Sequence, residues 1–501
     1  MPEMILDQLD TAQFGDKRLT KRFVRIMERV SEKPNMSIPA AMKGRAEMEG
    51  AYRFCDNPKV SPEAIRSPHV AATYERIRQT DVVVLVQDTT QLDVTRPRQQ
   101  VRESGPLEFK TRFGAFVHPL IAFDTNGIPL GETWNKTWVR KSIETQVPRS
   151  EKRDRRMATP IEDKESFRWL EGLRAAREVA KVCPDTQCIC VGDSEADIYE
   201  LFAEPRNTGE GQELQLLVRA CHDNRVLSNH PQNLVETLRA SSSLLSCSVK
   251  VSRRTPKVKA NKRKRTLERD ARVAAVEIRT ATVTLRPPHR PDRKLLEATL
   301  NVVLVEEPSP PEGQQPIQWI LLTTLPIDNL EQVQLIVKYY GIRWQIEVYF
   351  KTLKSGCRIE ERYFEEMDRL LNCVAVYSIV AWKILYLCRL SQQCPDLDCE
   401  VVFEPCEWKP VYMVTHNNVL PQSPPTLNEM VRMIASLGGY VMRSKNQPGS
   451  QTLWLGLQRL HDLSQAWNSF GPEASARMPR GGDQLCHDGP SRGSDRGRGR
   501  V

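Results

Sequence analysis

The chain has 501 residues, which is long enough for two to four domains, each with its own hydrophobic core. Its 72 basic and 63 acidic residues give a formal charge of +9, a modest excess that is compatible with a polyanionic partner without requiring one. We see no apolar run long enough to span a bilayer and no secretion signal at the start, so we expect a cytoplasmic protein with no membrane partner.

The segment from residue 1 to about 75 has helical character and many basic residues. Positive side chains alternate with apolar ones and recur at Lys17, Arg18, Lys21, Arg22 and Arg25. A run of charges of one sign is typical of a solvated helix face, and it is equally typical of a face that contacts DNA phosphates. Both interpretations stay open for this segment when it is taken alone.

The next part of the chain alternates strand and helix patterns. The run VVVLV at 82–86 predicts a buried strand, and residues 112–139 predict a hairpin around Asn126-Gly127. Residues 162–182 have helical character, and a second buried run, QCICV, leads into a further helical stretch. Three strands, a helix, a strand and a helix in this order match the beginning of a ribonuclease-H-like α/β fold.

Two aspartates follow the predicted buried strands. Asp88 comes directly after VVVLVQ, and Asp193 comes directly after QCICVG. Carboxylates at the carboxyl ends of central strands lie where open α/β sheets place their ligands. For either aspartate alone a helix cap or a turn residue is the plainer interpretation, so it is the combination that indicates a site.

The second half of the chain begins with a change of pattern. Alternating, β-branched segments from about 208 to 328 predict a β-rich region, and within it the basic stretch 253–265, RRTPKVKANKRKR, predicts an exposed loop available to phosphate. Helical character covers 330–390 with interruptions and returns over 427–470. The tail 471–501 is rich in Gly, Arg, Asp and Ser, and we expect it to be disordered because it cannot bury enough apolar area.

The helical segment YYGIRWQIEVYFKTLK, residues 339–354, carries two different faces. One face is apolar and is expected to pack on the core; it consists of Ile342, Ile346, Tyr349 and Leu353. The other face is polar and consists of Tyr340, Arg343, Glu347, Lys351 and Lys354. This polar face is either an ordinary solvated surface or a surface for a phosphodiester, in which Glu347 holds a metal ion and the cations contact phosphate oxygens.

Thirteen cysteines are scattered along the chain. Cys394, Cys399, Cys406 and His416 have the residue types of a zinc site. No C-x-x-C pair supports such a site, so reduced and mostly buried thiols are the favoured interpretation.

Several motifs together resemble a known family. The pattern Y-x-x-R-x-x-x-E-x-x-x-x-x-x-K, formed by Tyr340, Arg343, Glu347 and Lys354, resembles the signature of the insertion-sequence-four family of bacterial transposases. GDKRLTKR, EGAYRFCDNPKVSPEAIR, VQDTT, GDSEAD, WILLTTLP, and SLGGYVMRSK with WLGLQRLHDLSQAW resemble the transposon-five branch of that family. The resemblance covers about residues 10 to 470, and the order of the motifs makes it specific.

The resemblance implies a DDE transposase that cuts at transposon ends and inserts the element elsewhere. Asp88, Asp193 and Glu347 would be its catalytic residues and would hold two Mg²⁺ ions, which Mn²⁺ can replace. The residues that match DNA-contacting positions are Arg18, Arg22, Arg53, Trp319, Tyr340, Arg343, Lys351 and Lys354. Trp319 matches a tryptophan linked to holding a flipped base at a hairpin step. The implied partners are transposon ends, target DNA and a second copy of the chain in a paired-end complex.

The implied fold is α/β: a ribonuclease-H-like catalytic core with a β-rich insertion, flanked by helical N- and C-terminal domains. The expected boundaries are an end-binding domain at 1–75, a core at 76–207 and 329–390, an insertion at 208–328, a dimerisation domain at 391–470 and a disordered tail at 471–501. Apolar residues of the last helical block are expected either to form the dimer contact or to pack within their own chain; they are Met430, Met433, Ile434, Leu437, Tyr440, Leu453, Trp454, Leu457 and Leu460.

Two positions depart from the family pattern, and two other functions stay open. Ser194 stands where the branch has an arginine in D-R-E-A-D, and Leu19 stands where the family can carry another arginine. One alternative function is a non-catalytic DNA-binding inhibitor or inactive copy, against which the three acids and the basic helix face argue. Another is a metal-dependent nuclease without strand transfer, against which the C-terminal block argues.

Overall fold

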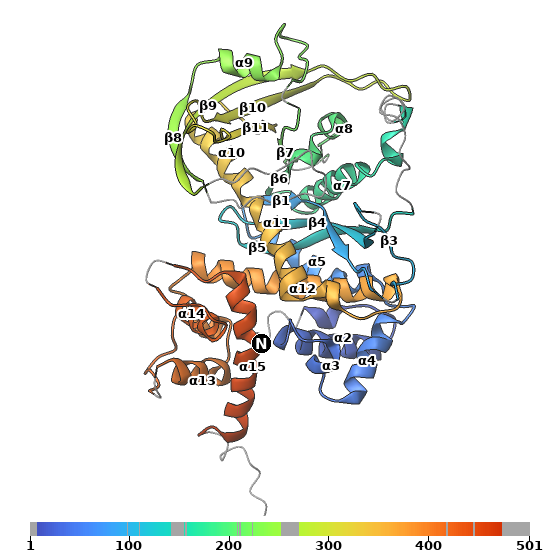
Figure 1. The fold of residues 1–501 in the computed structure, drawn as a ribbon, viewed down its shortest axis with the longest axis vertical. Helices are drawn as coiled ribbons and strands as arrows, with labels where there is room; N and C mark the ends of the chain where they lie inside the picture. Colours follow the sequence, from blue (N-terminus) through green and yellow to red (C-terminus); the bar gives the residue numbers. More distant parts are fainter. Residues whose placement is uncertain are drawn as a thin grey trace, which may run out of the picture.

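The computed structural model describes residues 8–472 except 98, 110, 142–154, 156–157, 208, 210–211, 223, 252–269, 417–418 and 444–445. The predicted basic loop at 253–265 and nearly all of the tail predicted at 471–501 lie outside the described residues. A mixed sheet occupies the middle and top of the molecule, and helices form its base (Figure 1).

The described strands form one sheet in the order β2-β4-β1-β6-β7-β11-β10-β9-β8, with β3 and β5 also pairing with β4. Its parallel centre consists of β1 (Val82–Gln87), β6 (Gln187–Gly192) and β7 (Gln215–Arg219). β1 and β6 are buried over nearly their whole lengths, which confirms the prediction from their continuous apolar runs.

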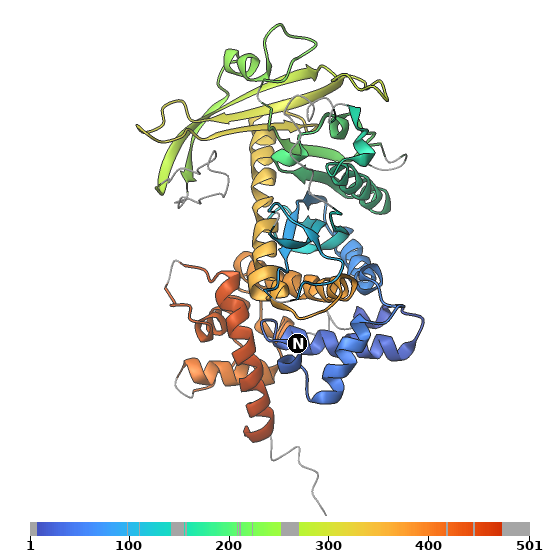
Figure 2. The ribbon, with the colours of Figure 1, turned by 45° about the vertical axis from the view of Figure 1, so that its right-hand side comes forward.

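The other strands pair in antiparallel fashion. They are β2 (Thr90–Asp93), β3 (Gly105–Pro106), β4 (Phe113–Phe123), β5 (Pro129–Trp138), β8 (Leu245–Val251), β9 (Arg272–Leu285), β10 (Ala298–Glu306) and β11 (Gln318–Thr323). β4 and β5 form the predicted hairpin, whose turn uses Gly127 at a φ of 79°. β8 to β10 continue the sheet past β11 at the top of the molecule, as Figure 2 shows.

Helices cover both faces of the sheet and form the base of the molecule. The described α-helices are α2 (Lys17–Glu32), α3 (Ile38–Ala41), α4 (Arg45–Cys55), α5 (Pro62–Ile77), α7 (Phe167–Val182), α8 (Tyr199–Ala203), α9 (Leu234–Ala240), α10 (Leu330–Ile342), α11 (Trp344–Lys351), α12 (Met367–Gln393), α13 (Pro405–Thr415), α14 (Leu427–Leu437) and α15 (Ser450–Phe470). Alternate residues of β1 enter two apolar clusters. Val83 and Leu85 pack with α7, whereas Val84 and Val86 belong to the cluster that contains α11 and α12.

α10 and α11 form one nearly continuous helical run beside the centre of the sheet (Figure 2). The predicted apolar face is confirmed, because Ile342, Ile346, Tyr349 and Leu353 are all buried. The prediction for Tyr340 was wrong in part, since this residue of the polar face is also buried. The run ends in a single π-helical turn, Thr352–Gly356, and a Cβ on Gly356 would lie 2.8 Å from the Trp454 ring of α15.

α12 lies at the centre of the helical base and bonds to segments far apart in sequence. Asn372 Nδ2 donates to Cys55 O at 2.9 Å, and Trp382 Nε1 donates to Pro129 O at 2.8 Å. By length and composition α12 could cross a bilayer, contrary to our expectation that no segment could. Its residues are mostly buried against α5, β5, α14 and α15, which accounts for its apolar composition.

The C-terminal helices bury most of the residues that the sequence offered as dimer contacts. Met430, Met433 and Ile434 of α14 and Leu453, Trp454 and Leu460 of α15 pack within their own chain. Other apolar residues of this region are exposed instead: Val441, Met442, Leu455 and Phe470. The amphipathic pattern is therefore explained largely by intramolecular packing.

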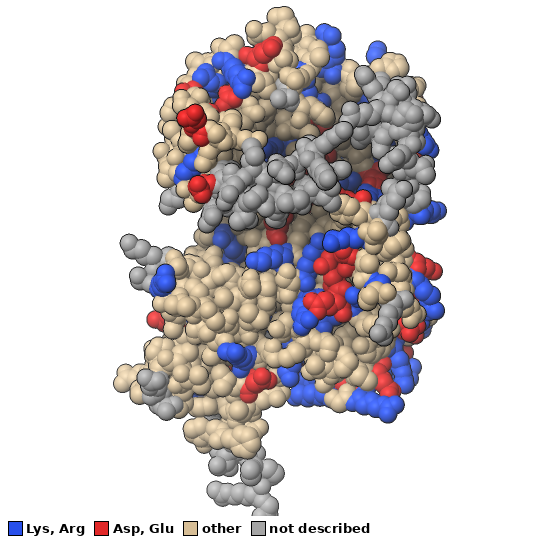
Figure 3. Space-filling view, in the orientation of Figure 1, with Lys and Arg blue, Asp and Glu red and all other residues tan. Residues whose placement is uncertain are grey.

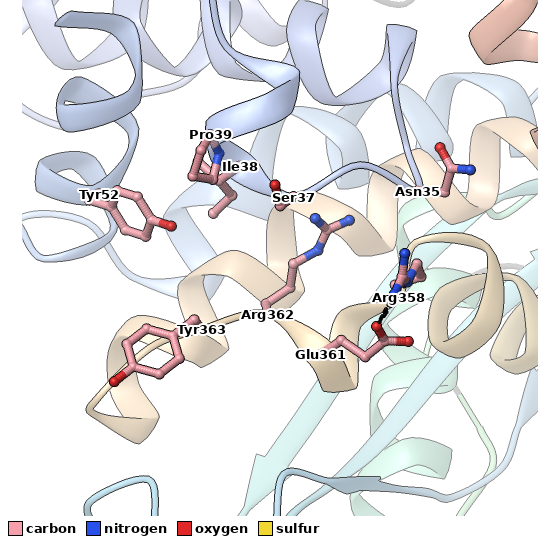
Figure 4. Close-up of a pocket in the computed structure, with 9 residues that line it drawn as sticks. All are labelled: Asn35, Ser37, Ile38, Pro39, Tyr52, Arg358, Glu361, Arg362 and Tyr363. Carbon is pink, nitrogen blue, oxygen red and sulfur yellow. Dashed lines mark hydrogen bonds and ion pairs between the residues drawn. The ribbon is translucent and has the colours of Figure 1, made fainter. Parts of the chain in front are cut away.

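Arg362 bonds the segment after α11 to the connection between α2 and α3. Its guanidinium donates to the carbonyl oxygens of Pro34, at 2.8 Å, and Met36. A pocket of about 300 Å³ lies beside this junction (Figure 4). Its walls come from the α2–α3 connection, from Tyr52 of α4 and from the segment around Arg358.

Candidate active site

Two of the predicted acids lie at one edge of the sheet because their strands are parallel neighbours. Asp88 follows β1, Asp193 follows β6, and the two strands pair in parallel along their lengths. The carboxyl ends of adjacent parallel strands meet at the same edge, so these two carboxylates share one end of the sheet.

Glu347 reaches the same edge from α11, and Arg343 links it to Asp88. Arg343 Nη1 lies 3.1 Å from Asp88 Oδ2 and 3.5 Å from Glu347 Oε1. The negative charge of Asp193 acts on both Asp88 and Arg343. The structure thus brings the three predicted acids together around one guanidinium.

Asp88 lies in an environment that disfavours its charged form. Its pKa is raised to about 7, chiefly by burial and next by the negative charge of Asp193. The Thr89 N–H, which donates to Asp88 Oδ1 at 2.7 Å, and the Arg343 guanidinium act in the opposite direction. The carboxylates therefore lack positive charge that a bound divalent cation would supply.

Arg343 is held by the acids and by the ring beneath it. Burial lowers its pKa, but the neighbouring Tyr340, Asp88, Asp193 and Glu347 outweigh burial and raise that pKa overall. The guanidinium carbon lies 5.9 Å from the centre of the buried Tyr340 ring. The buried Tyr340 ring therefore packs beneath the Arg343 guanidinium.

The two lysines of the polar face differ in their surroundings. Lys351 is exposed at the end of α11. Lys354 lies on the π-helical turn, where burial lowers its pKa, and its Nζ is 3.8 Å from Glu360 Oε1. The negative charge of Glu347 also acts on Lys354, which places this cation near the acids.

Asp193 serves as a helix cap as well as a candidate ligand. Its Oδ1 accepts the Glu195 N–H at 2.8 Å at the start of the 3-10 turn Ser194–Ala196. Asp197, the last acid of GDSEAD, is buried and accepts the backbone N–H groups of Cys221 and His222 at 2.7 and 2.9 Å. That acid holds the turn to the loop after β7 and is structural.

The donor set fits the group that the resemblance implies. Among the described residues no three His, Cys, Asp or Glu side chains lie close enough to hold a metal ion as they stand, whether at the three acids or at the cysteines considered for zinc. The three acids nevertheless supply only carboxylate oxygens, the ligand type that Mg²⁺ prefers. The Arg343 guanidinium between two of them already offsets part of their negative charge.

The predicted DNA contacts of the N-terminal segment lie on α2 and α4. Arg18, 89% exposed, pairs with Asp16 at 3.0 Å, and Arg53, 74% exposed, pairs with Glu49 at 3.1 Å. Arg22 is exposed as well. Figure 3 shows basic side chains gathered over these helices at the lower right. Leu19 is buried, so the position where the family can carry another arginine faces the core here.

Trp319 lies on β11, opposite Val305 of β10. Its side chain is half-buried and packs against the larger apolar cluster. The side chain is therefore partly packed and partly open to solvent, and in the described part of the chain no hydrogen bond joins Trp319 to the three acids.

Sequence reasoning missed one cation of the site, Arg168 of α7. Its side chain is only 11% exposed, and it donates to Thr89 Oγ1 and to Glu195 Oε2, each at 2.7 Å. These residues lie next to Asp88 and close to Asp193. No local pattern marks Arg168, because its partners are 79 and 27 residues away.

Comparison with known families gives three matches along the chain. Residues 3–60 match the family described as transposase DNA-binding, residues 185–376 match the transposase DDE domain, and residues 379–467 match the transposase Tn5 dimerisation domain. The DDE match includes two of the acids, Asp193 and Glu347.

Among solved structures, the chain is similar to a piggyBac transposase synaptic complex with hairpin DNA, determined by cryo-EM. The sequence identity is 12%, the alignment covers 78% of this chain and 74% of that chain, and the TM-score is 0.34. A similarity at that level carries no argument about this protein.

Proposed function

Because the chain is a DDE transposase related to the Tn5 branch, we propose that it binds the terminal repeats of its mobile element, cleaves the ends through a hairpin and joins them to target DNA. The observation that supports this most strongly is the convergence of Asp88, Asp193 and Glu347 on Arg343. We further propose that the core is ribonuclease-H-like and that the protein acts in the bacterial cytoplasm, on the nucleoid.

We propose a separate role for each segment of the chain. Residues 1–75 bind the ends, 76–207 with 329–390 carry the chemistry, 208–328 form an insertion, and 391–470 support a dimer. Double-stranded DNA and a second copy of the chain are the partners.

In the proposed reaction, the three carboxylates would hold two Mg²⁺ ions, whose chemistry when bound would be to activate the attacking oxygen and neutralise the leaving oxygen. Arg343, Lys351 and Lys354 contact phosphate oxygens of the bound end, with Arg343 oriented by Tyr340. Asp88 and Asp193 are kept in place by the backbone N–H groups of Thr89 and Glu195. Cleavage and joining differ only in which oxygen attacks, so one site serves both.

The deciding experiment is to incubate the protein and Mg²⁺ with DNA that carries the ends of its own element and to resolve nicked, hairpin, double-cut and joined products. Joined products support a transposase. Cleavage without joining would indicate a nuclease, and end binding without cleavage would indicate a non-catalytic inhibitor or an inactive copy.

We expect Arg18→Ala and Arg53→Ala to weaken end binding, because each exposed guanidinium contacts a phosphate after leaving its carboxylate partner. Each variant should lower the slope of log affinity against log salt by about one unit. Fluorescence anisotropy across a salt series measures this, with Arg78→Ala, an exposed arginine of the α5 end, as the control. Parent-like binding by both variants at every salt concentration would exclude the role.

We expect Trp319→Ala to slow hairpin formation about tenfold while changing the first nick little. Stacking an extruded base on an aromatic ring stabilises it by roughly 1–3 kcal/mol, which the variant would lose. Trp319→Phe should retain part of the rate because it keeps a ring face. A time course of nicked and hairpin products is the measurement. Equal slowing of every step would show that the half-buried indole acts only in packing.

We expect Leu455→Asp and Phe470→Asp to weaken dimer formation at least tenfold without unfolding the chain. Both residues are exposed on α15, Phe470 at 88%, and the face over α13 to α15 is largely uncharged in Figure 3. Burying one such side chain contributes about 1.5–3 kcal/mol per copy. Sedimentation of the end-bound protein measures assembly, with Leu296→Asp, a change at another exposed leucine outside the C-terminal helices, as the control. Dimers of parent strength in both variants would place the contact elsewhere.

A further inference from the structure

A chain of hydrogen bonds begins at the active-site edge and runs behind Asp88. Arg168 Nε donates to Thr89 Oγ1 at 2.7 Å, and Thr89 Oγ1 lies 2.8 Å from His118 Nδ1. The backbone N–H of the same threonine donates to Asp88 Oδ1 at 2.7 Å. One residue therefore connects the candidate metal ligand to α7 and β4.

The chain continues across the interior of the sheet. His118 Nε2 lies 3.0 Å from Gln87 Oε1, and Gln87 Nε2 donates to Cys190 Sγ at 3.3 Å. All three residues are buried. α7 approaches closely enough only because it carries Gly172, where a Cβ would lie 2.1 Å from Gln87 Oε1. The connection thus depends on a glycine placed one helical turn after Arg168.

Arg168 favours one direction for the hydrogen bonds in this chain. A guanidinium only donates, so it turns the hydrogen of the Thr89 hydroxyl away from itself and towards His118 Nδ1, and the Gln87 amide oxygen facing Nε2 agrees with that order. The imidazole is then neutral with its hydrogen on Nε2, which donates to Gln87 Oε1. Burial lowers the pKa of His118 well below its usual value, in agreement with a neutral ring.

The other side of the same guanidinium reaches the second aspartate turn. Arg168 Nη2 donates to Glu195 Oε2 at 2.7 Å, and Nη1 donates to Glu165 O at 2.8 Å. The Glu195 N–H in turn donates to Asp193 Oδ1 at 2.8 Å. Arg168 therefore bonds to a residue that holds each of the two strand-end aspartates.

We propose that Arg168 is a positioning residue of the active site, which favours one proton order in the chain behind Asp88 and ties that chain to the Asp193 turn. This inference rests on the proposed function, since it assumes that both aspartates hold metal. Groups that orient metal ligands change metal affinity about 10–100-fold when they are removed. Arg168 would act in this way, through Thr89 and Glu195, without touching the metal or the substrate.

The first test measures Mn²⁺ binding by electron paramagnetic resonance on the full chain without DNA. Arg168→Ala should weaken binding about 10–100-fold. Arg168→Lys should weaken it less, because its ammonium can still donate to either Thr89 or Glu195, although it cannot reach both. Arg174→Ala is the matched control: it lies on the same helix and pairs with Glu204 at 2.7 Å, away from the chain. Parent-like binding in both Arg168 variants would overturn the proposal.

The second test reads the proton order directly and needs neither metal nor activity. The chain is labelled with ¹⁵N at its 8 histidines, and the His118 signal is identified as the one that disappears in His118→Gln. Nitrogen NMR should then show the His118 hydrogen on Nε2. Arg168→Ala should mix the two tautomers, whereas Arg174→Ala should not. An unchanged tautomer in Arg168→Ala and Arg168→Lys would overturn the proposal. A parent protein that binds no Mn²⁺ would instead contradict the proposed function, and the tautomer would still decide the role of Arg168.

Discussion

Glu347→Gln should lower the rate of end cleavage about 1000-fold, the equivalent of roughly 4 kcal/mol of transition-state stabilisation. The variant keeps the size of the side chain but removes the charge that faces Arg343 and the proposed metal ions. Asp88→Asn and Asp193→Asn should have effects of similar size, because the acids act as one unit and their losses do not add.

End binding should survive these changes, since they remove metal ligands and leave the DNA-contacting cations in place. Glu331→Gln, an exposed glutamate at the start of α10, is the control on the same helical run. Cleavage rates and end affinity would be measured on the same preparations. Cleavage by Glu347→Gln within tenfold of the parent rate would remove Glu347 from the catalytic set.

Arg66→Met should lower the free energy of unfolding by about 3–5 kcal/mol, because it leaves a buried carboxylate without its partner. Arg66 Nε lies 3.2 Å from Glu132 Oε1, and both side chains are almost wholly buried. Glu132 also accepts a bond from Tyr349 of α11 at 3.4 Å. The measurement is urea unfolding, with Arg78→Met of the exposed Arg78–Glu75 pair as a control that should cost less than about 1 kcal/mol.

The loss in Arg66→Met should depend on pH in a defined direction. Burial already raises the pKa of Glu132, and removal of the Arg66 charge raises it further. The folded variant then binds a proton that the unfolded chain does not, so its stability should rise as the pH falls from 7 towards 5. Arg66→Met combined with Glu132→Gln should recover much of the loss. A loss that is the same at both pH values would show that packing, and not the buried charge, is responsible.

Local patterns predicted the parts of the fold that depend on nearest neighbours in sequence. Continuous apolar runs predicted β1 and β6, and residue spacing predicted the buried face of α11, because burial on both sides of a strand or on one side of a helix requires those patterns. Strand-end placement also predicted that Asp88 and Asp193 share one edge.

The remaining features depend on contacts that no local pattern contains. Tyr340 steps with the polar residues, but its ring is apolar enough to be buried beneath Arg343. An amphipathic helix shows the same spacing of apolar residues whether it packs on its own chain or on a second copy. Spacing alone therefore could not show that most apolar residues of α14 and α15 pack within the chain. Arg168 meets its partners only because α7 begins beside the residues that follow β1 and β6.

α12 limits where this chain can be divided into separate domains. The DDE match ends at residue 376 and the dimerisation match begins at 379, so the boundary between them falls inside this one helix, far from either end. The same helix is bonded to the N-terminal segment through Asn372 and to β5 through Trp382. The two segments that match different families therefore share one helix, and they should melt in one cooperative transition. Chimeras that exchange C-terminal regions between relatives should consequently keep α12 whole and preserve the faces of α14 and α15 that pack on it.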